Sequence, residues 1–412
     1  MRKQPDKLER RLAGHEQQPG VGWFATHQRE LKTMPKRPRY ALLVLTLVSA
    51  LAHADEPIKP DPISTHEERA EQLLRQALAD DGGAGIAAAV LVNGQLRFAG
   101  AAGHADMEGN RPLRADTPLR IGSVSKLITT ALVCRLIDAQ ALDPDANIET
   151  LVPEFHVYPE AGASAITARR LANHTSGIRH YDFADLAEAN NQRYYPDLAA
   201  ALGVFADDPL LASPGAEHHY SSFGYNLLGV AASRAAEASF ADAVQSLVSD
   251  PLGLSQTVID HPLQLVVDRA RFYTVYHGEL INTFWRDSSD YYPSGGMLSS
   301  AVDLARLTEA MFHGDFLSDQ TRSLLTSESH SLQGPTGYSF GWQVKIDTDG
   351  SKHYEHGGET NGAYAWVYYD PERRLVVAGA ANYNVFPSQS ESAFFSLAMA
   401  GLTELYGTAA GE

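Results

Sequence analysis

The chain has 412 residues, with 33 Lys and Arg against 50 Asp and Glu, which gives a formal net charge of −17 at pH 7. Such an acidic protein is repelled by nucleic acid and by anionic membranes, so neither is expected as a partner. The single cysteine, Cys134, excludes a disulfide framework within one chain and is expected to be a buried apolar residue. No metal-ligand spacing is present, so no metal site is predicted.

The first 64 residues are predicted to lie outside the folded unit. Residues 34–54 consist of a basic stretch, a short apolar run and a small-residue cleavage site that ends at Ala54. This order is typical of a secretory signal peptide, and the apolar run is too short to span a membrane. We expect 1–33 to be a non-native or disordered leader and 55–64 to be a linker. We therefore expect export to a bacterial periplasm, without a stable membrane anchor. An uncleaved signal anchor is the alternative.

The folded unit is expected to span 65–412 and to begin with a helix and a hairpin. Residues 66–80 carry apolar side chains at helical spacing, opposite a charged face. Two apolar runs, 85–92 and 95–100, then flank Asn93-Gly94. An Asn-Gly pair between such runs is the strongest short signal for a β-hairpin.

The next predicted element is a helix over 123–137 that opens with an S-x-x-K motif, Ser123 to Lys126. Residues three apart lie on one helix face, so the Ser123 hydroxyl and the Lys126 amine are expected within hydrogen-bond reach. A serine becomes a nucleophile when an adjacent base takes its proton, and burial lowers the pKa of a lysine towards that role. The helix N-terminus would favour a developing anion. The alternative is a capping serine beside a solvated lysine.

The remainder of the chain is predicted to contain a helical middle and a mixed tail. Residues 123–299 read mostly as helix and loop, punctuated by Pro and Gly. The tail is predicted to contain an amphipathic helix, three strands and a closing helix, over 300–313, 341–346, 363–369, 375–380 and 388–405. We therefore predict an α/β fold in which one sheet with helices, from 65–122 and 300–412, carries an all-α lobe.

Two further motifs follow the S-x-x-K motif, Tyr220-Ser221-Ser222 and then His356-Gly357-Gly358. In this order, the three resemble the motifs of the penicillin-recognising serine hydrolases, and within that family the class C β-lactamase and esterase branch, of peptidase family S12 type. The stretches 174–181 and 220–225 are most similar to the branch that contains the mitochondrial serine β-lactamase-like protein. The resemblance covers nearly all of residues 66–405.

This resemblance implies a β-lactamase/transpeptidase-like fold with an antiparallel sheet, and acyl-enzyme chemistry without a cofactor. It implies that Ser123 is acylated, that Lys126 helps to accept its proton, and that Tyr220 is the partner base and the acid for the leaving group. The oxyanion would lie on the backbone N–H groups of Ser123 and Glu359. The remaining residues expected at the substrate are Ser222, His356, Gly357 and Gly358.

Two positions depart from the family motifs. Ser222 stands where the family has Asn, and Gly357 stands where a hydroxyl residue usually helps to bind a substrate carboxylate. His356 also replaces a permanently charged lysine. These changes favour a peptidase or esterase acting on a small-molecule or peptide substrate over a true β-lactamase, which stays an alternative.

Several of these residues also have a structural alternative. Tyr220 could be a core aromatic and His356 a strand-end histidine, and His174 is expected to be structural, with its ring bonded to the turn 175–177. A non-catalytic binding or assembly protein that keeps the fold is the alternative function from a different class. No oligomeric state is predicted.

Overall fold

The computed structural model of the chain describes residues 65–155, 165–182, 185, 188, 190–347, 350–386 and 393–409. The predicted signal peptide 34–54 and the segments 1–33 and 55–64 lie outside the described residues. Among the helices of the described ranges, none combines the length and the apolar character that crossing a membrane requires.

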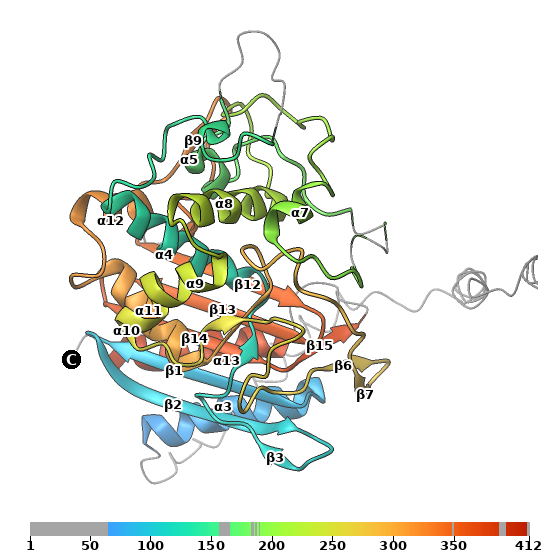
Figure 1. Cartoon of the computed structure of the whole chain (residues 1–412). Coiled ribbons are helices and arrows are strands. Elements are labelled where there is room, and N and C mark those ends of the chain that lie inside the picture. Colours follow the sequence, from blue (N-terminus) through green and yellow to red (C-terminus); the bar gives the residue numbers. More distant parts are fainter. Residues whose placement is uncertain are drawn as a thin grey trace, which may run out of the picture. The chain divides into compact units, whose positions relative to one another are not determined.

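Figure 1 shows the order of the elements along the chain. The helices are α3 (His66–Asp81), α4 (Ser125–Asp138), α5 (Ala168–Ala172), α7 (Leu198–Leu202), α8 (Ser222–Ala235), α9 (Phe240–Val244), α10 (Asp250–Leu252), α11 (Ala301–Phe312), α12 (Asp319–Thr326) and α13 (Ala393–Ala409). The strands are β1 (Gly85–Val92), β2 (Gln95–Asp106), β3 (Arg111–Pro112), β4 (Leu119–Arg120), β5 (Val258–Ile259), β6 (Tyr273–Tyr276), β7 (Glu279–Asn282), β8 (Met297–Ser299), β9 (His330–Ser331), β10 (Gly334–Pro335), β11 (Gln343–Ile346), β12 (Lys352–Thr360), β13 (Ala363–Asp370), β14 (Leu375–Ala381) and β15 (Tyr383–Phe386). Short turns of other helical types are η4 (Gly122–Val124), η5 (Ile148–Thr150) and η6 (Gln245–Ser249).

The predicted opening helix and hairpin are confirmed. Thr65 caps α3 in a capping box with Glu68, which satisfies backbone donors at the helix start. Asn93 and Gly94 both adopt positive φ, 52° and 75°, as a two-residue type I′ turn requires. The two strands therefore pair in antiparallel register from Val92 opposite Gln95.

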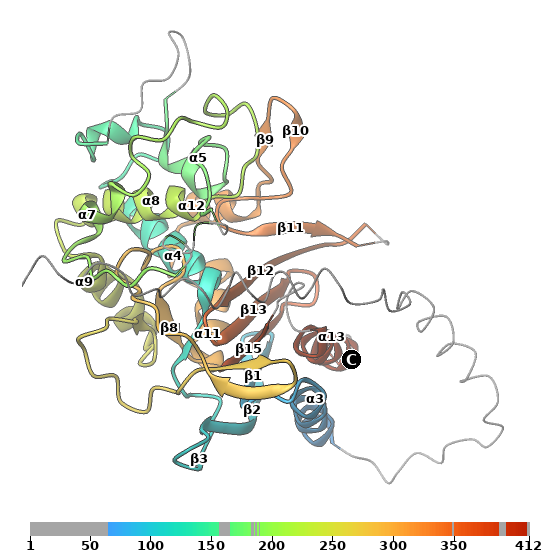
Figure 2. The ribbon, with the colours of Figure 1, turned by 90° about the vertical axis from the view of Figure 1, so that its right-hand side faces the viewer.

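An antiparallel sheet, in the order β11-β12-β13-β14-β1-β2-β3, lies between two layers of helices (Figure 2). Side chains of β1 alternate between its two faces. Ala87 and Ala89 join the core that includes α4 and α11, whereas Ile86 and Val90 join the core that includes α3 and α13. This arrangement confirms the predicted sheet flanked by helices.

The lobe predicted to be all-α over 123–299 is helical only in part. α4 packs against α8, and the predicted burial of Cys134 on α4 is confirmed. The C-terminal part of the lobe, however, contains β5 to β8, and β6 and β7 form a three-stranded sheet with β15. These strands are only two to four residues long, too short for an alternating pattern to be recognised.

The third motif lies in a strand that is absent from the three strands predicted for the tail. His356, Gly357 and Gly358 lie inside β12, which pairs with both β11 and β13. Glycine and charged residues, which disfavour strands, dominate this segment, so its sequence did not indicate one. The pairing places β12 against the turn η4 that carries Ser123.

Candidate active site

Ser123 lies in the turn η4, immediately before α4, instead of in the first turn of the α-helix as predicted. The turn depends on Gly122, whose φ is +50° and where a Cβ would fall 2.7 Å from the backbone N of Glu359. Glycine alone tolerates both the conformation and the close approach. Gly122 therefore lets β12 lie directly beside Ser123.

Lys126 is fully buried, and its amine contacts three oxygens. Nζ lies 3.1 Å from the Ser123 hydroxyl, 3.0 Å from the Ser222 hydroxyl and 2.7 Å from the carbonyl oxygen of Ser294. The predicted proximity of Ser123 and Lys126 is thus present, and the solvated-lysine alternative is wrong. Burial holds the pKa of Lys126 well below its usual value.

These three contacts suit a neutral amine. A neutral lysine has two N–H donors and one lone pair. The Ser294 carbonyl and the Ser222 hydroxyl can accept the two N–H groups, which leaves the lone pair for the Ser123 O–H. In this state the amine is arranged to take the serine proton.

Tyr220 lies just before α8, and its ring centroid is 4.9 Å from Lys126 Nζ. Burial raises the pKa of Tyr220 to about 12, although hydrogen bonds with Ser123 and Ser222 act in the opposite direction. The phenol is therefore protonated at neutral pH, which suits a proton donor and makes it a poor base. Tyr220 lies beside Ser123 and Lys126, as the sequence predicted. Of its two predicted roles, the structure favours the acid for the leaving group and not the partner base.

Gly358 brings β12 into contact with the backbone around Ser123. A Cβ at this position would fall 2.2 Å from the carbonyl oxygen of Ile121 and 2.9 Å from the backbone N of Ser123. No other residue fits without moving one of the two segments. The backbone of Gly358 and Glu359 consequently lies beside the N–H of Ser123, where the predicted oxyanion site would form.

His356 is buried, and its Nδ1–H donates to the carbonyl oxygen of Gly357 at 2.7 Å. Its Nε2 atom has no hydrogen-bond partner within the described part of the chain. Burial and the charge of Lys126 lower the pKa of His356 to about 3. Hence the third motif, with Gly357 next to a neutral ring, supplies no positive charge at pH 7.

Two histidines hold the second motif in place. Nδ1 of His174 accepts the backbone N–H of Ser221, and Nδ1 of His180 accepts that of Ser222, both at 3.1 Å. The ring of His174 also lies 4.4 Å from that of Tyr220. His174 is therefore structural as predicted, although its acceptor bonds Ser221 and not the following turn. The role of His180 was missed, and its only sequence signal was its place in the resembling stretch 174–181.

The buried imidazoles predict that the folded state loses stability in mild acid. An ordinary histidine has a pKa of 6.5, whereas burial lowers the pKa to about 4 for His180 and to about 3 for His356. Below pH 6.5 the unfolded state therefore binds more protons than the folded state. The stability that each neutral histidine contributes is complete above pH 6.5 and is lost as the pH falls towards 4. We expect about 2 kcal/mol less free energy of unfolding per histidine between about pH 7 and pH 5.

Urea unfolding at the two pH values measures this effect. In His180→Asn, the amide oxygen can still accept the Ser222 N–H but the side chain no longer titrates. The variant should lose stability on acidification less steeply than the wild type. The same pH dependence in both proteins would contradict the prediction.

The fold and the Ser123–Lys126–Tyr220 arrangement define the class of penicillin-recognising serine hydrolases. The β-lactamase family profile matches residues 70–398, and the chain belongs to this family. The human mitochondrial serine β-lactamase-like protein LACTB is 28% identical over 312 residues, 60% of this chain and 56% of the human protein. The chain thus spans little more than half of that relative's length.

The chain is also similar to an esterase and to a penicillin-binding protein homologue. Esterase EstB of Burkholderia gladioli is 29% identical over 321 residues, 68% of this chain and 80% of the esterase. The octameric penicillin-binding protein homologue of Pyrococcus abyssi has a solved structure that superimposes with a TM-score of 0.69 at 22% identity. That match covers 82% of this chain and 77% of the other, and it confirms the predicted fold.

Proposed function

We propose that the protein is a serine hydrolase that cleaves an ester or amide bond through an acyl-enzyme. The observation that carries this proposal is the buried Lys126 amine in contact with the Ser123 hydroxyl, beside the protonated phenol of Tyr220. A binding or assembly protein would have no use for a lysine buried at a cost in desolvation. The non-catalytic alternative is therefore disfavoured.

In the proposed acylation step, Lys126 Nζ takes the Ser123 proton while Oγ bonds to the substrate carbonyl carbon. The negative charge that forms on the carbonyl oxygen lies towards the backbone N–H groups of Ser123 and Glu359. Collapse of this intermediate breaks the bond to the leaving group, which takes the Tyr220 proton. The contacts of Ser222 with Lys126 and Tyr220 provide a path by which the lysine reprotonates the tyrosine. A water molecule then attacks the acyl carbon and gives a proton to Lys126 Nζ. Collapse of that intermediate breaks the bond to Ser123 Oγ, which takes the proton back from the lysine, and the acid is released.

The preferred substrate is proposed to be an ester or amide without a carboxylate on its leaving group. His356 is neutral and Gly357 has no side chain, so the third motif offers neither charge nor hydroxyl to a carboxylate. The similarity to an esterase supports this choice. The basic and apolar segment 34–54 supports a further proposal, that the protein is exported and acts in the periplasm.

Comparison of substrates tests the proposal. We expect p-nitrophenyl butyrate to be hydrolysed with a kcat/KM about tenfold to hundredfold above that for nitrocefin or a D-alanyl-D-alanine peptide, because a missing bond to a charged group has that effect. Ser123→Ala provides the background rate for the activated ester. A higher kcat/KM for nitrocefin would instead identify a β-lactamase.

A further inference from the structure

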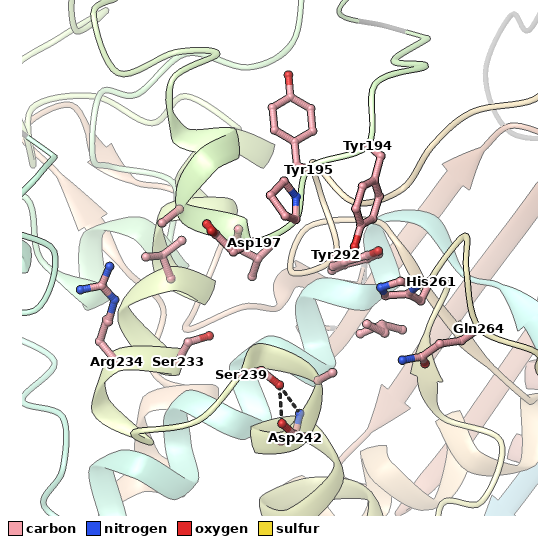
Figure 3. Close-up of a pocket in the computed structure, with 16 residues that line it drawn as sticks. Tyr194, Tyr195, Asp197, Ser233, Arg234, Ser239, Asp242, His261, Gln264 and Tyr292 are labelled. Carbon is pink, nitrogen blue, oxygen red and sulfur yellow. Dashed lines mark hydrogen bonds between the residues drawn. The ribbon is translucent and has the colours of Figure 1, made fainter.

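A cavity of about 480 Å³ lies in the helical lobe, apart from the proposed active site (Figure 3). Its walls come from the start of α7, the second half of α8, the start of α9 and the loops that carry His261 and Tyr292. Val230 on the α8 wall follows Ser222 by eight residues, which is about 12 Å along a helix. The volume of the cavity is within the range that small organic ligands occupy.

One side of the cavity is aromatic. Figure 3 shows Tyr194, Tyr292 and His261 together, facing the side that carries Asp197 and Arg234. The ring centroids of Tyr194 and His261 are 5.9 Å apart, and those of His261 and Tyr292 are 6.2 Å apart. Tyr194 is 41% exposed and Tyr292 is 7% exposed, so this aromatic wall runs from the surface into the core. Such a wall suits stacking with a planar ring.

The charged residues of the lining favour a cation. Asp197 accepts the backbone N–H of Ala200, and Asp242 accepts the hydroxyl of Ser239, but within the described ranges neither carboxylate forms an ion pair with a basic side chain. Arg234, by contrast, is paired with Glu154 at 2.7 Å. The cavity thus presents two carboxylates that belong to no ion pair among the described residues, beside an arginine that is already paired.

We propose that this cavity binds an aromatic organic cation. The ring of the ligand lies against the aromatic wall, and its positive charge lies towards Asp197 and Asp242. Aromatic faces attract cations, and the carboxylates add to that attraction. A carboxylate ligand of the same shape would be repelled, and a neutral one would have the stacking alone.

The cavity is joined to the proposed active site by three consecutive residues. Tyr292 lines the cavity, and Pro293 packs on α8 where Gly229 leaves room, since a Cβ there would fall 2.2 Å from the proline ring. The carbonyl oxygen of Ser294 accepts from Lys126 Nζ. A ligand that displaces Tyr292 would therefore move the acceptor that holds the lysine. This coupling rests on the proposed function, whereas binding does not.

Isothermal titration of the full chain with benzamidine tests the binding. Benzyl alcohol and benzoate, of similar shape, are the neutral and the negative controls, and we expect both to bind at least about threefold more weakly. Tyr194→Ala should weaken benzamidine binding about threefold to tenfold, and Tyr194→Phe, which keeps the ring, by less than about twofold. Tyr194 suits this test because its exposed side chain can be removed without opening the core.

The charge is tested with Asp197→Asn, which keeps a capping side chain at the start of α7. We expect it to weaken benzamidine about threefold and to leave benzyl alcohol unchanged. Equal affinity of Tyr194→Ala and wild type for benzamidine, or of benzoate and benzamidine for the wild type, would overturn the proposal. Loss of binding in Ser123→Ala would also overturn it, because the ligand would then occupy the active site.

The coupling has a separate readout, the rate at which a fluorophosphonate labels Ser123. Saturating benzamidine should change this rate at least about twofold in the wild type, and in Tyr194→Ala the same change should need a benzamidine concentration about threefold to tenfold higher. An unchanged rate would overturn the coupling and leave the binding result intact. If Ser123 is never labelled, the proposed function fails, and the calorimetric comparison still decides whether the cavity binds the cation.

Discussion

Replacing Ser123 with alanine is expected to abolish covalent labelling by a fluorophosphonate and to reduce ester hydrolysis by at least about 10⁴-fold. The substitution removes the oxygen that is proposed to form the acyl-enzyme, while the lysine, the tyrosine and the glycines of β12 remain. Stability should change by less than about 2 kcal/mol, because Ser123 is only half-buried and its loss removes two hydrogen bonds, one with Lys126 and one with Tyr220.

Intact-mass spectrometry measures the labelling directly. One adduct per wild-type chain, mapped to the peptide that contains Ser123, and none on the variant would establish an activated serine. Ser327→Ala, on the exposed end of α12, is the matched control and should label as the wild type does. Labelling of Ser123→Ala at the wild-type rate would contradict the mechanism, and an unlabelled wild type would favour the non-catalytic alternative.

The features that the sequence predicted correctly are those that depend on local geometry. Ser123 and Lys126 meet because residues three apart along a helical turn face the same way. The hairpin forms because Asn93 and Gly94 tolerate positive φ. The fold class followed from long apolar strands such as β1, β13 and β14, whose pattern needs no knowledge of distant partners.

The features that were missed depend on residues far apart in the chain. His174 and His180 accept backbone groups 47 and 42 residues away, so no local pattern marks them as supports of the second motif. The strand β12 is held by its pairing with β11 and β13, and its own composition disfavours it. The proton-donor role favoured for Tyr220 arises from burial, which raises the phenol pKa and which sequence alone does not quantify.

Lys126→Met is expected to lower the rate of Ser123 labelling and of ester hydrolysis by about 10²- to 10⁴-fold, the usual contribution of a general base. Methionine fills the volume of the buried lysine chain but has no nitrogen to accept the serine proton. The fold should persist, since removing a buried amine relieves its desolvation while leaving the Ser294 carbonyl without that donor. Thermal unfolding of both proteins checks this point.

The matched control is Lys345→Met, which removes a half-exposed lysine on β11 whose ion pair, within the described residues, is with Glu355. It should keep the wild-type rate.

In the wild type, the labelling rate should also rise with pH through the lowered pKa of Lys126 and level off above it, because only the neutral amine can accept a proton. Wild-type labelling by Lys126→Met would exclude the lysine as the base. In that case, the neutral state that burial imposes on Lys126 would serve only the packing of α4 against α8.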